Sequence, residues 1–261
     1  MFLAIDIGNT NTVIGVYQNN QLVSSWRLVS SHTRTIDEYW IVTKLFCEDA
    51  NIDIRSIKGI IIGSVVPALT RNYHEMARKY FNLEALIVNH ELDLGFELRV
   101  ERPESVGADR ICNVAAARQI YAKPAIVIDL GTATTFDVID EKGDYIGGAI
   151  APGIYTAGYE LSRKAAKLSN IELVKPRNYI GKNTTEHLQM GIFIGHIAMI
   201  EGLVNRMIKE FSSEQKFFII ATGGLSGEIT SNCSLISKSD KNLTLEGLKI
   251  LYNRNASDTF V

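Results

Sequence analysis

The sequence predicts an α/β protein of two similar lobes, each a mixed sheet flanked by helices. Three observations lead to this prediction. From Met1 to about Leu28, apolar runs alternate with short polar turns, as in a three-stranded meander. Strand-length apolar runs then alternate with helical periods, which favours mixed sheets covered by helices. The pattern of the meander also returns later in the 261-residue chain, which indicates an internal repeat.

The first turn of the meander is the polar stretch Asp6–Thr12, between two apolar runs. Gly8 can take backbone angles closed to other residues, and the short side chains after it crowd N–H and hydroxyl donors into one small place. Such a turn suits a phosphate, and an acid at its mouth, Asp6, suggests a nucleotide with bound Mg²⁺. A lone turn of this kind is equally well an ordinary hairpin of the Asx type. The candidate phosphate-binding residues are Gly8, Asn9, Thr10, Asn11 and Thr12.

The echo of this turn lies at Ile128–Thr135, where an apolar strand again ends in Asp, followed by Gly and small hydroxyl residues. One constant spacing in the numbering separates Asp6 from Asp129, and it also separates Gly8 from Gly131 and Thr12 from Thr135, so the repeat needs no gap. Two copies of a strand–turn–strand unit predict two halves that face each other, with their acidic turns meeting at a cleft.

The remaining elements follow from apolar runs and helical periodicity. We expect domains of residues 1–117 and 118–261. The expected helices are Thr35–Asp49, Pro67–Phe81, one beginning near Asp109, Ile154–Leu168, a long helix from the Gly181–Glu186 loop to Phe211, and a closing helix around Leu243–Tyr252. The expected further strands are Gly59–Gly63, Ala85–Val88, Ala125–Leu130 and Phe217–Ala221.

Composition excludes several classes. A net charge of −2 and scattered basic residues argue against nucleic acid as a partner. The three cysteines are far apart and fit neither a disulfide framework nor a zinc site, so we expect a reducing, cytoplasmic setting. The N-terminus reads as a strand with an acid at position 6, and we expect no signal peptide and no membrane span.

A second polar stretch, Pro103–Arg110, precedes a helical period. Asp109 in the first helical turn is explained by the helix macrodipole alone, worth about 0.3–1 kcal/mol. However, Gly107 leaves room for a ligand at the backbone, and Arg110 adds a cationic fork beside the acid. A small carboxylate or amide substrate fits such a site.

The twin halves, each opening on a meander with an acid-Gly-Thr turn, resemble the superfamily of acetate and sugar kinases, Hsp70 and actin. This resemblance implies ribonuclease H-like lobes with the active site in the cleft between them, where paired turns bind the phosphates of ATP.

A closer resemblance covers nearly the whole chain. The segments Asp6–Thr10, Glu104–Arg110, Asp129–Thr134, Gly147–Gly153 and Thr222–Gly224 are similar, in this order, to type III pantothenate kinases. The resemblance implies phosphorylation of pantothenate by ATP in the first step of coenzyme A synthesis. It also implies a homodimer that needs Mg²⁺ and a monovalent cation, K⁺ or NH₄⁺.

The resemblance also implies residue roles. Asp109 is the expected base for the pantothenate hydroxyl, kept ionised and weak by the helix start. Asp6 holds Mg²⁺ through water, and Asp129 ligates the monovalent cation. The remaining expected contacts are Thr132 with phosphates, Gly223 and Gly224 with adenosine, Gly107, Ala108 and Arg110 with the substrate, and Thr184 with the substrate of the partner subunit. Val100 stands where the family often has a tyrosine that contacts the substrate.

Several points stay open at this stage. A helix cap is the favoured explanation of Thr184 or Thr185 from the residues alone. Gly191 and Gly195 lie on one helical face and predict close packing, either within the chain or against a second subunit. The five histidines show no metal-ligand spacing and no partner. The alternative functions are a kinase for another small alcohol and a non-catalytic regulatory factor on the same scaffold.

Overall fold

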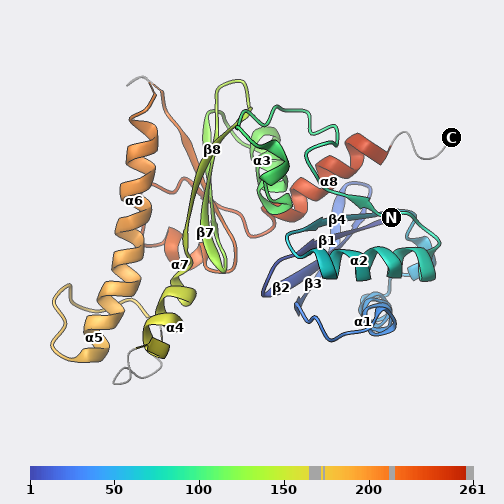
Figure 1. The fold of residues 1–261 in the computed structure, drawn as a ribbon, viewed down its shortest axis with the longest axis horizontal. Helices are drawn as coiled ribbons and strands as arrows, with labels where there is room; N and C mark the ends of the chain where they lie inside the picture. Colours follow the sequence, from blue (N-terminus) through green and yellow to red (C-terminus); the bar gives the residue numbers. More distant parts are fainter. Residues whose placement is uncertain (165–171, 173, 212–214, 257–261) are drawn as a thin grey trace. The chain divides into compact units, whose positions relative to one another are not determined.

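The computed structural model describes residues 1–164, 172, 174–211 and 215–256 (Figure 1). The chain forms two compact units, Met1–Ile120 with Asn242–Val261, and Tyr121–Lys241. Each unit contains one five-stranded mixed sheet with helices packed on it. The predicted class, α/β with two similar lobes, is confirmed.

The first unit has the strand order β3-β2-β1-β4-β5. Strands β1, β2 and β3 form the antiparallel meander, and β4 and β5 continue the sheet in parallel. The strands are β1 Phe2–Ile7, β2 Asn11–Gln18, β3 Gln21–Val29, β4 Ile60–Ser64 and β5 Leu86–Ile87. The helices are α1 Ile36–Asp49, the short η1 Ile54–Ser56, α2 Pro67–Met76 with its π-helical extension η2 Ala77–Phe81, η3 Pro103–Ser105, α3 Ala108–Ile120 and α8 Leu243–Asn255.

The two faces of this sheet carry different helices, because side chains alternate along a strand. Leu3, Ile5 and Ile7 of β1 pack in the core that includes α1 and α2. Phe2 and Ala4 belong to the core that includes α3 and α8. The same alternation directs the side chain of Asp6 toward the face that α3 covers.

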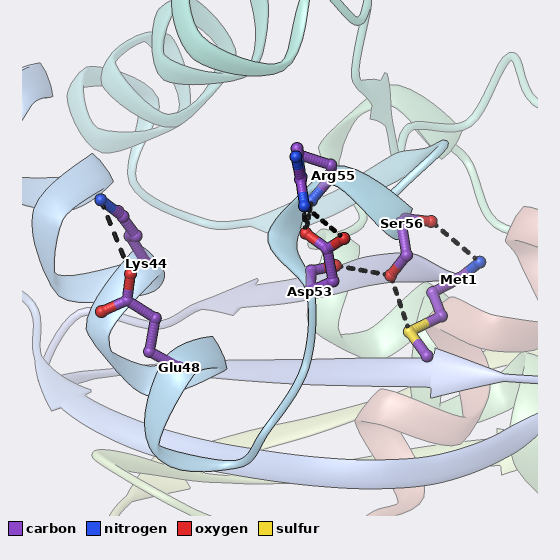
Figure 2. Close-up of polar contacts among 6 residues, drawn as sticks. All are labelled: Met1, Lys44, Glu48, Asp53, Arg55 and Ser56. Atoms are coloured by element: carbon purple, nitrogen blue, oxygen red, sulfur yellow. Dashed lines mark hydrogen bonds and ion pairs between the residues drawn. The ribbon is translucent and has the colours of Figure 1, made fainter.

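The start of β1 is anchored at the end opposite its polar turn, as Figure 2 shows. The amino group of Met1 donates to the carbonyl oxygen of Ser56 at 3.3 Å, and the Ser56 hydroxyl lies 3.1 Å from the Met1 sulfur. Asp53 accepts from the backbone N–H of Arg55 at 3.0 Å and so caps η1. The exposed pair Lys44 and Glu48, 3.6 Å apart on α1, adds little stability.

The second unit has the order β10-β9-β6-β7-β8, so its meander occupies the same place as in the first sheet. The strands are β6 Ala125–Leu130, β7 Ala133–Ile139, β8 Tyr145–Pro152, β9 Phe218–Thr222 and β10 Lys238–Ser239. The helices are α4 Ile154–Lys164, α5 Thr184–Gln189, the π-helical η4 Met190–Ile194, α6 Gly195–Ile208 and α7 Ser226–Thr230.

The repeat extends to details of burial and register. In β1 and β6 every residue is buried except the acid, Asp6 or Asp129, which is partly exposed. In both meanders the pairing of the second and third strands shifts near the same place, after Val16 and after Val138. Such a shared irregularity is a feature of the repeated unit rather than a defect.

The repeat is not free of gaps, and this corrects the sequence expectation. Ile7 pairs with Thr12 in the first copy, whereas Leu130 pairs with Thr134 in the second. The second turn is thus one residue shorter, and Thr134 rather than Thr135 is the counterpart of Thr12. The next hairpin also differs, because Gln18 pairs with Gln21 but Ile139 pairs with Tyr145.

The division into units differs from the expected boundary, residues 1–117 and 118–261. Helix α8 belongs to the first unit, where Leu245, Leu248 and Leu251 are buried with α3. Burying each such side chain contributes about 1.5–3 kcal/mol. The two helices cross so closely that a methyl group on Gly247 would overlap the backbone of Cys112.

The expected helices and strands are present, with two qualifications for the second unit. The end expected at Leu168 lies outside the described residues, and α4 is described to Lys164. The expected long helix runs over α5, η4 and α6, visible in orange in Figure 1, and contains a π-helical segment.

By length and composition alone, the stretch Thr184–Ile208 is apolar enough to cross a membrane. Its buried side chains, such as Ile197, Ile200 and Val204, pack in the core of the second unit.

Candidate active site

The turn after β1 is held by Ser30, the residue that follows β3. Gly8 N–H donates to the Asn11 carbonyl at 3.0 Å, and Ser30 N–H donates to the Thr10 carbonyl at 2.9 Å. The Ser30 hydroxyl donates to the Gly8 carbonyl at 2.7 Å and lies 2.9 Å from the Thr12 hydroxyl. Asn9 and Thr10 are exposed at the tip of the turn, whereas Thr12 is buried. The Thr12 side chain therefore supports the turn from within.

Asp6 and the start of α3 meet on one face of the first sheet. Asp6 lies beside Gly63 of β4 in register, and a methyl group on Gly63 would lie 3.4 Å from the Cys112 sulfur. Cys112 follows Asp109 by three residues on α3, so the two share a helix face. A side chain at Gly63 of β4 would push against Cys112 of α3. The glycine thus lets α3 lie close to Asp6.

The backbone before α3 is fitted around the Asp109 carboxylate. A methyl group on Gly107 would lie 2.5 Å from Asp109 Oδ1 and 3.4 Å from Val65, whose N–H donates to the Ile7 carbonyl at 3.1 Å. Asp109 Oδ1 also accepts from the Arg110 N–H at 2.8 Å. The predicted pair of Gly107 and Asp109 therefore lies at the same edge of the sheet as the first turn.

The electrostatics of this edge correct the expectation that the helix start makes Asp109 a weak base. Burial raises the pKa of the Asp109 carboxyl above its usual value, and the hydrogen bond from Arg110 N–H and the charge of that residue oppose the rise only in part. Burial also raises the pKa of the Cys112 thiol, and the charges of Asp6 and Asp109 add to that rise. Asp109 is thus a stronger base than the helix start alone predicts, because desolvation outweighs the nearby donors.

The two carboxylates create a negative field that a cation would relieve. Among the described residues, no group of three His, Cys, Asp or Glu side chains has the geometry to hold a metal ion by itself. Mg²⁺ in phosphoryl-transfer sites takes only one or two carboxylates and completes its shell with water and phosphate oxygens. Asp6 fits that limited role.

The turn after β6 is built from different contacts. Gly131 N–H donates to the Ala133 carbonyl at 3.0 Å, while the Thr132 carbonyl accepts from Gly153 N–H at 3.1 Å and from the Thr156 hydroxyl at 2.6 Å. Thr132 is exposed at the tip. A methyl group on Gly153 would lie 2.5 Å from the Thr132 oxygen, so only glycine fits beneath this turn.

The turn after β9 lies against Asp129. Asp129 pairs in register with Thr222, and Gly223 has a φ of +88°. A side chain at Gly223 would come within 2.7 Å of both Asp129 Oδ1 and the Leu130 carbonyl. Gly224, in contrast, has open space where a side chain would be. The structure thus brings Asp129, Gly131 and Gly223 together within the second unit.

Three expected features of the long helix are refined. Asn183 caps α5 through its side chain, which accepts from Glu186 N–H at 3.0 Å, so neither Thr184 nor Thr185 is the cap. Thr184 is exposed at the first helical position. A methyl group on Gly191 or Gly195 would have nothing within 4 Å, so close packing within the described chain is excluded for them.

Sequence reasoning missed several supporting residues. His196, expected to have no partner, lies 3.0 Å from the buried Thr134 hydroxyl. Ser30 and Thr156, which hold the two turns, carry no sequence signal beyond small polar side chains near a strand end. Val100 lies half-buried in the segment that links β5 to α3.

Comparisons with known proteins agree with this arrangement. The family model of type III pantothenate kinase matches residues 2–206. The type III pantothenate kinase of Moorella thermoacetica is 45% identical over 255 residues, covering 98% of this chain and 100% of that protein. The enzyme of the same name from Roseiflexus sp. is 46% identical over 257 residues, with the same coverage.

Solved structures with lower identity share the fold. The activator of 2-hydroxyisocaproyl-CoA dehydratase from Clostridium difficile, with bound ADPNP, is 14% identical, with a TM-score of 0.54 over 100% of this chain and 97% of that one. MreB 5 of Spiroplasma citri, bound to AMPPNP, is 14% identical, with a TM-score of 0.52 over 97% and 96%. Both matches support the actin-like architecture of the two units. By its sequence, the chain belongs to the type III pantothenate kinase family.

Proposed function

We propose that the protein transfers the γ-phosphoryl group of ATP to the 4′-hydroxyl of pantothenate, the first step of coenzyme A synthesis. The observation that carries this proposal is the fit of the Gly107–Arg110 backbone around Asp109, on the same sheet edge as Asp6 and the first turn. Phosphoryl transfer needs an acceptor oxygen held in line and compensation of charge, and little covalent work by the protein.

Asp109 accepts the proton of the pantothenate hydroxyl. Its raised pKa favours this role, because a base works best when its pKa approaches the working pH. Gly107, Ala108 and Arg110 bind the substrate, with the Arg110 guanidinium suited to a carboxylate. The absence of a side chain at Gly107 leaves room for the Asp109 carboxylate against the backbone, which fixes the base beside the residues that bind the substrate.

Asp6 would hold Mg²⁺ through water, and when bound this ion would supply positive charge that offsets the charge of the phosphates. Gly8, Asn9, Thr10 and Asn11 provide N–H and side-chain donors at the turn. Thr12 contributes by fixing the turn, since its hydroxyl lies beside Ser30.

Residues of the second unit also bind the nucleotide, and one of them binds the monovalent cation. Thr132, exposed at its turn, binds phosphate oxygens, and Gly223 and Gly224 accommodate the adenosine part. Asp129 ligates the monovalent cation, K⁺ or NH₄⁺, for which oxygen ligands are the suitable chemistry. The contact between Asp129 and Gly223 supports a shared role for these residues.

The active species is a homodimer in which Thr184 contacts pantothenate bound to the partner subunit. Support comes from a set of exposed apolar and small residues on the second unit. Tyr155 and Tyr159 of α4 are 57% and 60% exposed, and Gly191 and Gly195 offer open space nearby. A second copy that covers this surface would account for the exposed tyrosines and for the open space at the two glycines.

We place the protein in the cytoplasm.

The decisive experiment is an assay of the purified protein with ATP, Mg²⁺ and pantothenate, with and without K⁺. Formation of 4′-phosphopantothenate, detected by mass spectrometry, is the expected result, and K⁺ should raise the rate. Phosphorylation of another small alcohol in a substrate panel, in place of pantothenate, would reassign the substrate. Nucleotide binding without transfer to any alcohol would favour a regulatory factor.

A further inference from the structure

In the two copies of the meander, a buried threonine hydroxyl after the turn has different hydrogen-bond partners. Thr12 and its counterpart Thr134 are both buried at the first ladder pair after the turn, and a buried hydroxyl needs a hydrogen-bond partner. In the first copy, the partner is the Ser30 hydroxyl at the end of the same meander.

The second copy cannot use this solution. Ser30 N–H donates to the Thr10 carbonyl, and Gly153 N–H donates to the Thr132 carbonyl, so Gly153 is the counterpart of Ser30. A side chain at Gly153 would collide with the turn, at 2.5 Å from the Thr132 oxygen. The position that supplies a hydroxyl in the first copy therefore has none in the second.

His196 supplies the missing partner from another element. Its Nε2 lies 3.0 Å from the Thr134 hydroxyl, and 62 residues separate the two in the chain. The imidazole is buried at 7% exposure, and burial lowers its pKa, so it is neutral at physiological pH. A neutral imidazole serves either as acceptor from the hydroxyl or as donor to it.

We propose that His196 is a positioning residue for nucleotide binding, which acts through Thr134 on the turn that carries Thr132. This inference rests on the proposed role of Thr132 at the phosphates. Removal of the imidazole would leave the buried Thr134 hydroxyl without its partner and free the start of β7 to shift. The exposed Thr132 would then lose its alignment with the phosphate oxygens. The residues around Asp109 would keep their positions.

The inference has a structural corollary for the long helix. His196 is the second residue of α6, and the π-helical segment η4 separates it from Thr184 in α5. A π-helical turn changes the rotation of the following residues and is frequent at functional sites. The same continuous helix thus carries Thr184, proposed to contact the substrate of the partner subunit, and His196, which contacts the start of β7 after the second turn.

The test compares His196→Leu with His196→Gln, which keeps a hydrogen-bonding group, and with Thr134→Val, which replaces the hydroxyl by a methyl group. We expect His196→Leu and Thr134→Val each to raise the Kd for MgATP, measured by calorimetry, roughly tenfold. The KM for pantothenate should stay within twofold, and His196→Gln should recover most of the affinity. The double variant His196→Leu with Thr134→Val should lose less than the sum of the two single effects, because they remove one interaction.

The matched control is Ile200→Val, in the same helix and fully buried, which loosens packing without touching the turn. Its nucleotide affinity should equal that of the original protein. If His196→Leu does not fold, the comparison of His196→Gln and Thr134→Ser with Thr134→Val decides the question. Unchanged MgATP affinity in Thr134→Val and His196→Leu, or equal losses for ATP and pantothenate, would overturn the inference.

The outcomes separate this inference from the proposed function. MgATP binding by the original protein without pantothenate phosphorylation would overturn the proposed function alone, since the affinities of the variants still test His196. Normal phosphorylation with unaffected variants would overturn the role of His196 alone. A protein that binds no MgATP would overturn both.

Discussion

The turns after β1 and β6 have the same acid and glycine but depend on different parts of the chain. The first is held by Ser30, which lies in its own meander and binds both Gly8 and Thr12. The second is held by Gly153, by Thr156 of α4 and, through Thr134, by His196 of α6. The hydroxyl that holds the first turn thus comes from its own meander, whereas the second turn is coupled to α4 and α6, and mutations in those two helices should reach it.

The acids of the two turns also lie in different surroundings. Asp6 shares its side of the sheet with Asp109, and both charges act on the Cys112 thiol. Asp129 lies against Gly223 and pairs in register with Thr222. On the proposed assignment, Mg²⁺ is bound in the first environment, where two carboxylates add their negative charge, and the monovalent cation is bound at Asp129.

The largest expected effect concerns Asp109 of the first unit. Asp109→Asn should lower kcat by about 10²–10⁴-fold, the usual worth of general base catalysis. The pKa of Asp109 is raised in the folded state, so its ionised form is disfavoured by folding, and removal of the charge should not lower the melting temperature at pH 7. Kinetics together with thermal unfolding check this. A variant with turnover within a few-fold of normal would exclude Asp109 as the base.

The pH profile tests the same group without mutation. Because burial raises the pKa of Asp109 in the free enzyme, the acidic limb of kcat/KM should lie at a higher pH than the value near 4 of an ordinary aspartate. Below that limb kcat/KM should fall about tenfold per pH unit, as the base becomes protonated. Measurement of kcat/KM from pH 4 to 8 gives the position of the limb. A flat profile down to the ordinary value would contradict the effect of burial on this carboxyl.

The contrast between the acids predicts different losses for matched variants. Asp6→Asn should lower kcat by about 10²–10³-fold and weaken the dependence on Mg²⁺, as expected when a transition-state charge contact is removed. Asp129→Asn should instead remove most of the activation by K⁺. Titration of each ion against each variant measures both effects. Identical ion profiles for the two variants would show that the turns do not divide the ions between them.

The supports of the two turns predict a difference in stability. Gly153→Ala should destabilise by about 1–3 kcal/mol, because the added methyl group overlaps the Gly131 and Thr132 backbone. Ser30→Ala should cost about 1 kcal/mol, the net value of a typical hydrogen bond. Urea unfolding of both variants gives the comparison. Equal stability of Gly153→Ala and the original protein would mean that the second turn tolerates the shift.

The smallest expected effect concerns the open face of the long helix. In an isolated chain, Gly195→Ala should stabilise by about 0.5–1 kcal/mol, since alanine favours helices and nothing obstructs its methyl group. If a second copy packs against Gly195, the same change should weaken the dimer. Sedimentation analysis over a range of concentrations distinguishes the two effects. Unchanged dimerisation would exclude this face as the interface.

Much of the fold was predictable because its signals are local. The start of α2 at Pro67 and the strand β4 follow from helix-start chemistry and an apolar run. The cap of α5 was missed because three neighbouring residues can all act as caps, and only the backbone geometry selects Asn183. The assignment of α8 to the first unit was missed because its leucines pack on α3, far away in the chain.

The sequence by itself determined the two acidic turns, the glycine before Asp109 and the order of strands and helices, because turn chemistry and periodicity are properties of a few adjacent residues. Tertiary structure decided the rest. It set the raised pKa of Asp109, the length difference between the turns and the pairing of Thr134 with His196. Each of these depends on desolvation or on contacts between residues distant in the chain, which no local pattern records.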